Sequence, residues 1–129
     1  MDRFYLSNMD YRKITMRAEV TIEEGKIEEY KQLAQEMSKV VEDNQPDTLI
    51  FQFYFSRDER KSIIWETFAI SESVLTHMKG VAAQTIFPKI SNVCKINRVD
   101  MYGNPSEELQ NAIKNLGPQI YNHFTGFSR

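Results

Sequence analysis

Four segments of the chain show the two-residue alternation of apolar and polar positions that is typical of β-strands. The first spans residues 14–22, where every second residue is apolar. The second and third, 48–56 and 62–68, flank the charged stretch 57–61 and therefore predict a hairpin. The fourth segment, 94–102, alternates more weakly. Together they predict the strands of one sheet.

Between these segments the spacing of apolar residues changes to that of amphipathic helices. Residues 26–41 predict a helix of about four turns, which follows the first strand. After the hairpin, Ser71 and Gly80 are suitable caps for the two ends of a shorter helix. Residues 82–90 predict further helix, interrupted or restarted at Pro88.

This order of elements is the split β-α-β pattern of a ferredoxin-like α+β domain, with a four-stranded antiparallel sheet and helices on one face. We assign it to residues 13–103. Residues 1–12 show no period and are predicted to form an N-terminal arm. Residues 104–129 add a C-terminal helix, capped by Asn104 with Pro105 at its first position, and an aromatic tail. Four of the last eleven residues are large and apolar, so we expect the tail to pack.

The second predicted strand indicates how the sheet is covered. One of its faces is wholly apolar, and the other, which includes Ile50, Gln52 and Tyr54, is mixed rather than charged. A sheet with one face in water would alternate apolar and charged residues more clearly. We therefore expect a homodimer in which two sheets pack face to face and enclose the ligand site. The alternative is that the arm or the tail folds beneath the sheet.

Composition limits the possible functions. A chain of 129 residues can build one domain with its own core, and a net charge of −2 gives no general attraction to nucleic acid or anionic membranes. No apolar run approaches the roughly 20 residues of a membrane span, and the first residues lack a signal-peptide core. The only cysteine, Cys94, cannot form an internal disulfide and has no Cys or His at metal-ligand spacing. These features predict a cytoplasmic protein without a metal.

Two titratable residues stand in apolar surroundings. Glu66 shares one side of its strand with Ile64 and Phe68, so it is either an edge residue in water or a buried acid with a partner. His77 lies beside the apolar edge of the short helix. It is either a hydrogen-bonded boundary residue or a ligand or proton carrier.

The stretch that contains both residues, Trp-Glu-Thr-Phe-Ala-Ile-Ser-Glu-Ser-Val-Leu-Thr-His at 65–77, resembles the antibiotic-biosynthesis-monooxygenase family of dimeric α+β barrels. Members of that family carry a glutamate on the third strand, an aromatic residue two positions later and a histidine near the end of the next helix. Glu66, Phe68 and His77 match these positions, although members more often carry tryptophan where this chain has Phe68. The similarity covers about residues 13–103.

The resemblance implies a monooxygenase that oxidises a quinol or a polycyclic phenol with molecular oxygen and without a cofactor. An ionised, electron-rich phenol can itself reduce oxygen, so the protein has to bind it, remove a proton and exclude water. The implied base is His77 or Glu66, and Tyr102 or Arg98 would hold an oxyanion. Tyr54, Trp65 and Phe68 would form the walls of the pocket. The substrate-contacting candidates are Tyr54, Trp65, Phe68, Arg98 and Tyr102.

Two alternatives remain open at this stage. Relatives of the fold bind or degrade haem through a histidine of the second helix, a role that His77 would fill. Those relatives also resemble each other in an asparagine on the first strand and a tryptophan near the second helix, and this chain has neither. The other alternative is a non-catalytic dimer that binds a small molecule or a partner protein. In that case the tail, residues 118–129, would serve as a lid or a docking element.

Overall fold

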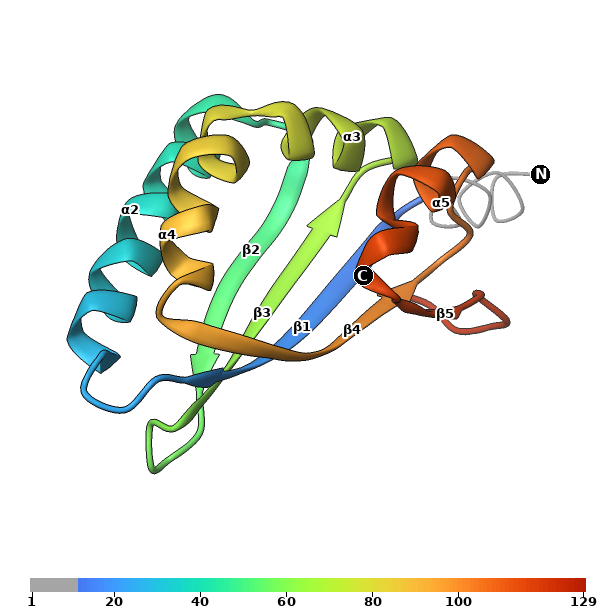
Figure 1. Ribbon diagram of the computed structural model, residues 1–129. Coiled ribbons are helices and arrows are strands. Elements are labelled where there is room, and N and C mark those ends of the chain that lie inside the picture. Colours follow the sequence, from blue (N-terminus) through green and yellow to red (C-terminus); the bar gives the residue numbers. More distant parts are fainter. Residues whose placement is uncertain (1–11) are drawn as a thin grey trace.

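The computed structural model describes residues 12–129, and these form one five-stranded sheet in the order β2-β3-β1-β4-β5 (Figure 1). The predicted arm lies outside the described residues except for Arg12. The first four strands pair antiparallel, which confirms the predicted α+β fold. The fifth pairs parallel with β4 and was not predicted. The strands are β1 (Ile14–Ile22), β2 (Thr48–Phe55), β3 (Lys61–Phe68), β4 (Cys94–Tyr102) and β5 (Gln119–Tyr121).

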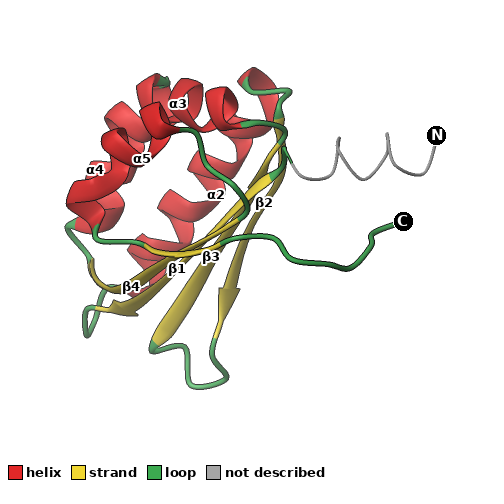
Figure 2. Cartoon of the chain, turned by 90° about the vertical axis from the view of Figure 1, so that its right-hand side faces the viewer, coloured by secondary structure: helices red, strands yellow, loops and turns green. Residues whose placement is uncertain are grey.

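All helices of the described chain lie on one face of the sheet (Figures 1 and 2). A π-helical turn stands immediately before the helix that contains Pro88, where the sequence predicted an interruption. The helical segments are α2 (Ile27–Asn44), α3 (Ser71–Lys79), the π-turn η1 (Ala82–Ile86), α4 (Phe87–Ser91), α5 (Glu107–Ile113) and the 3-10 turn η2 (Lys114–Leu116). None of them is long and apolar enough to cross a membrane.

Two predicted helix caps were wrong. Ser71 is the first residue of α3 rather than its cap, and its hydroxyl accepts a hydrogen bond from the backbone N–H of Ser106 (3.0 Å). The last helix is capped by Ser106 instead of Asn104, since the Ser106 hydroxyl accepts from the N–H of Leu109 (3.1 Å). Through the Ser106–Ser71 hydrogen bond, the segment before α5 is bound to α3. The C-terminal helix is thus attached directly to the domain.

The core lies between the sheet and the helices in two clusters. One is centred on Tyr30 of α2, and the other joins Phe68 of β3 to Leu109 and Ile113 of α5. Burial of each such aliphatic side chain contributes about 1.5–3 kcal/mol. The C-terminal helix is therefore part of the same core as the four-stranded unit.

The prediction that the tail packs was wrong for its end. Ile120 packs against the second cluster through β5, but Phe124 and Phe127 are 88% and 79% exposed. Strand β5 occupies the edge of the sheet beside β4, and the residues after it pair with no further strand. Figure 2 shows this last segment leaving the body of the domain.

Candidate acid–base site

Glu66 and His77 meet on the helix-covered side of the sheet. Glu66 points inward from the middle of β3, between Met16 of β1 and Phe51 of β2 in the register of the sheet. His77 lies in the last turn of α3, and its Nε2 stands 3.2 Å from Oε1 of Glu66. Only 9% of the histidine side chain and 14% of the glutamate side chain are exposed. Glu66 is therefore buried with a partner, which is the second of the two environments that the sequence left open for it.

Gln45, which follows the last residue of α2, fixes the orientation of the imidazole. Its Oε1 lies 2.7 Å from Nδ1 of His77 and also accepts a hydrogen bond from the Thr48 hydroxyl (3.1 Å). An amide oxygen can only accept, so Nδ1 carries a hydrogen. Nε2 is then left to share a proton with Glu66, either as an imidazolium–carboxylate pair or with the carboxyl group donating.

Two phenylalanines enclose the imidazole. The ring centroids of Phe68 and Phe51 lie 5.3 Å and 5.9 Å from that of His77. Phe68 was predicted as a wall, whereas Phe51 and Gln45 were not predicted. The alternation of β2 placed Phe51 on the apolar face, but nothing in the sequence indicated that this face meets α3. Gln45 follows the last residue of α2, and no sequence pattern marks it as a contact of His77.

An apolar cavity of about 260 Å³ borders the pair. Its walls come from both layers: Met16 and Ile64 from the sheet, Met37 from α2 and Met78 from α3. Glu66 and His77 are the titratable groups in this lining. A cavity with apolar walls and one or two convergent polar groups is typical of small-molecule sites. The arrangement can bind a small apolar molecule and exchange a proton with it.

The other predicted site residues lie on the opposite face of the sheet. Trp65 follows directly before Glu66, so the alternation of a strand places it on the other side. Its ring lies 6.1 Å from that of Tyr102, which stacks on Tyr121 at 5.4 Å. Tyr54 is exposed on this face as well. The sheet therefore separates these residues from the acid–base pair.

Arg98, the predicted oxyanion-holding residue, also lies on this face and is bound to other groups. Its Nε donates to the buried carboxylate of Asp100 (2.8 Å), and its guanidinium donates to the Tyr121 hydroxyl (2.8 Å). The hydrogen bond to Asp100 raises the pKa of Arg98 above its ordinary value. Arg17 adds a second cation 3.5 Å from the same carboxylate. This cluster is a structural ion network, and the cavity lies on the other side of the sheet.

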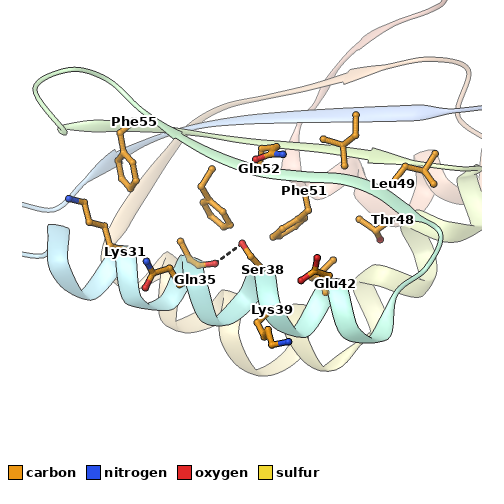
Figure 3. A pocket seen from close by; sticks show the side chains of 14 residues that line it. Lys31, Gln35, Ser38, Lys39, Glu42, Thr48, Leu49, Phe51, Gln52 and Phe55 are labelled. Carbon is orange, nitrogen blue, oxygen red and sulfur yellow. Dashed lines mark hydrogen bonds between the residues drawn. The ribbon is translucent and has the colours of Figure 1, made fainter. Parts of the chain in front are cut away.

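A wider groove of about 760 Å³ runs between α2 and the outer strand β2 (Figure 3). Phe51 and Phe55 line it on the strand side, and Lys31 and Ser38 line it on the helix side. The Ser38 hydroxyl donates to the Ala34 carbonyl (2.8 Å). No carboxylate–histidine pair faces this groove, so it offers no arrangement for proton transfer.

Other reactive groups are sparse within residues 12–129. The structure brings together no cluster of three or more His, Cys, Asp or Glu side chains there that could hold a metal ion. Burial raises the pKa of the half-buried Cys94 thiol, which keeps it protonated and weakly nucleophilic.

No protein-family model matches this sequence, and no curated protein matches it either. Solved structures, however, share the fold. The chain has the α+β fold of antibiotic biosynthesis monooxygenase structures. A protein provisionally named as such from Caulobacter crescentus has a TM-score of 0.63 at 14% identity, over 76% of this chain and 92% of its own. One from Nitrosomonas europaea has a TM-score of 0.63 at 12% identity, over 72% and 90%.

MupZ from Pseudomonas fluorescens is similar over a larger part of the chain. Its TM-score is 0.81 at 19% identity, and the similarity covers 92% of this chain and 95% of MupZ. Since residues 13–103 make up a smaller share of the chain, the match extends into the C-terminal addition. At these identities the comparisons establish the fold alone.

Proposed function

We propose that this protein is a cofactor-independent enzyme that moves a proton on a small apolar substrate bound between its helices and its sheet. The observation that carries the proposal is the 3.2 Å contact between His77 Nε2 and Glu66 Oε1 at the wall of an apolar cavity. A buried acid–base pair held by a third group is the arrangement that general acid–base catalysis requires. Gln45 is that third group.

The specific reaction we propose is the oxidation of a quinol or a polycyclic phenol by molecular oxygen. The substrate hydroxyl gives its proton to the Glu66–His77 pair, and the resulting phenolate is the reductant of dioxygen. One oxygen atom enters the substrate as a carbonyl at a ring C–H carbon, which gives a quinone. The other oxygen atom leaves as water with that ring hydrogen and the proton held by the pair, so the pair is regenerated. The residues of this chain bind the ring, accept the proton and exclude water. The fold shared with the Caulobacter and Nitrosomonas proteins supports this choice.

Oxygen uptake with a panel of quinols tests the proposal. We expect uptake by the wild type and a loss of about 10²-fold or more in Glu66→Gln and His77→Ala. His123→Ala is the control, because His123 is the other histidine of the chain and does not line the cavity. Wild-type uptake no greater than the blank would overturn the oxygenase and favour a non-catalytic binding protein.

Haem is a poorer candidate for this site. Both ring nitrogens of His77 already face oxygen atoms, of Gln45 and of Glu66, so neither is available to iron without loss of a contact. The cavity of about 260 Å³ is also small for a ligand of that size. A haem titration that produced a Soret band dependent on His77 would reverse this conclusion.

We also propose that the protein is a homodimer that packs through the uncovered face of its sheet. Ile50 and Tyr54 of β2 are exposed on this face, and Trp65 lies beside them on β3. Exposed apolar residues grouped on one sheet face are typical of an interface. In such a dimer each subunit keeps its own cavity, since the cavity lies on the helix side.

A further inference from the structure

The cavity beside Glu66 and His77 reaches the surface next to the C-terminal helix. Its lining is otherwise buried or half-buried, but Leu116 of η2 is 51% exposed and Ile96 of β4 is 37% exposed. A side chain that borders a cavity while half of it is in water must stand at an opening. Phe87 of α4 lines the same cavity, and Figure 1 shows α4 and α5 as separate helices over the sheet.

A bulge in β4 shapes one side of this opening. Val20 pairs with Ile96 and Glu19 with Arg98, so Asn97 is the extra residue. The bulge brings Ile96 and Val99, three positions apart, to the same face of the sheet, and both line the cavity. Bulges of this kind are frequent next to functional sites, where they redirect side chains.

Outside the opening lies a second hollow, of about 390 Å³, whose character is different. It shares Ile96, Val99 and Leu116 with the cavity, so the two spaces adjoin at these side chains. Its remaining lining is polar and includes Asn97 and Gln119. Its cation, Arg98, is already neutralised by Asp100, so the hollow offers hydrogen bonds more than charge. It suits a polar, uncharged group.

We propose that the substrate is amphipathic, with an apolar reacting end at Glu66 and His77 and a polar, uncharged extension that leaves past Leu116. The inner cavity alone is slightly smaller than most small-molecule sites, which fits a ligand that continues outside it. Leu116 is then a specificity-determining residue. It belongs to the C-terminal addition, which gives that addition a role in substrate selection. This inference rests on the proposed function, because it assigns the reacting end to the acid–base pair.

Two phenols that differ only in their tails test the inference by calorimetric titration. One is 4-ethylphenol; the other carries a triethylene glycol chain on the ethyl group, directed away from the hydroxyl. We expect the wild type to bind both. Leu116→Trp should weaken binding of the extended probe about tenfold more than binding of the compact probe, because the larger ring fills the exit. Leu49→Trp is the matched control, since Leu49 is 48% exposed and lines only the separate groove.

The outcomes separate the two proposals. If the wild type binds 4-ethylphenol but rejects the extended probe, or if Leu116→Trp weakens both probes equally, the exit past Leu116 is wrong while the acid–base function stands. If neither probe binds the wild type, both proposals are overturned. If both variants bind both probes as well as the wild type does, the exit past Leu116 is also wrong.

Discussion

Trp65 and Glu66 are neighbours in the chain and lie on opposite faces of the sheet. Glu66 contacts His77 beneath the helices, whereas Trp65 packs near Tyr102 on the uncovered face. One peptide bond thus separates two regions that perform different tasks. The helix side holds the buried acid–base pair and its cavity. The other side holds an aromatic and ionic surface suited to association.

The contact between Gln45 and His77 makes a prediction about the imidazole tautomer. We expect neutral His77 to carry its hydrogen on Nδ1, because Gln45 Oε1 lies 2.7 Å away and can only accept. In Gln45→Leu this preference should be lost, and the two tautomers should mix. The ¹⁵N chemical shifts of the ring report the tautomer directly, with His123 as the internal reference. An unchanged tautomer in Gln45→Leu would show that Gln45 does not orient the ring.

The Gln45→Leu substitution should also lower the enzymatic rate. A displaced imidazole is expected to lower kcat by about tenfold or more with little change in KM, because the substrate does not contact Gln45. Gln45→Glu keeps an acceptor oxygen and should recover part of the rate. If KM rises instead and kcat stays constant, Gln45 acts on binding.

Substitutions of Glu66 and His77 are expected to have coupled effects on the free energy of unfolding. Loss of one partner leaves the other buried without its contact, so Glu66→Met and His77→Leu should each destabilise the protein by about 1–3 kcal/mol. The double variant should be more stable than the sum of the two changes predicts, with a coupling energy of about 0.5–3 kcal/mol. Urea unfolding of the four proteins measures this. Strict additivity would mean that the two residues do not interact.

Ionisation of the buried Tyr30 hydroxyl should make the protein less stable at high pH. Burial raises the pKa of its hydroxyl from 10.0 to about 12, and the nearby Ser62 hydroxyl opposes the shift only partly. The folded state therefore binds this proton more tightly than the unfolded state. Its stabilising contribution is complete below pH 10 and is lost as the pH rises to about 12, by about 2–3 kcal/mol. Tyr30→Phe should show a smaller decrease over the same interval.

At neutral pH the same substitution should be harmless. The Tyr30 hydroxyl is buried, and the nearby Ser62 hydroxyl does not meet it in good hydrogen-bond geometry. Its removal should leave the free energy of unfolding unchanged or raise it by about 1 kcal/mol. Thermal unfolding at pH 7 and at several pH values above 10 measures both effects. A destabilised Tyr30→Phe at pH 7 would show that the hydroxyl has a partner, such as a buried water.

The proposed dimer predicts that one face of β2 controls association. Tyr54→Lys places a charge on the uncovered face and should convert a dimer at micromolar concentration into a monomer in sedimentation experiments. Val81→Lys changes a residue that is 64% exposed at the start of η1, in the helical layer on the other side of the sheet, and should leave the dimer intact. A wild type that sediments as a monomer would exclude this assembly.

The sequence by itself determined the order of the elements and which residues face each other across a strand. Alternation in β1 to β4 and the helical period of α2 follow from local geometry, so the α+β fold could be predicted without tertiary information. The resemblance at 65–77 also selected Glu66 and His77, which the structure brings together. The pairing of β5 and the exposure of Phe127 were beyond such patterns.

Only the tertiary structure decided which side of the sheet the helices cover. Period-two alternation states that Trp65 and Glu66 face opposite ways, but it assigns neither of them to the helices. That assignment comes from the packing of α3 and α5 on Phe68, between segments far apart in the chain. The contacts that build this site join residues between 9 and 32 positions apart, so the folded chain determines it and local patterns cannot contain it.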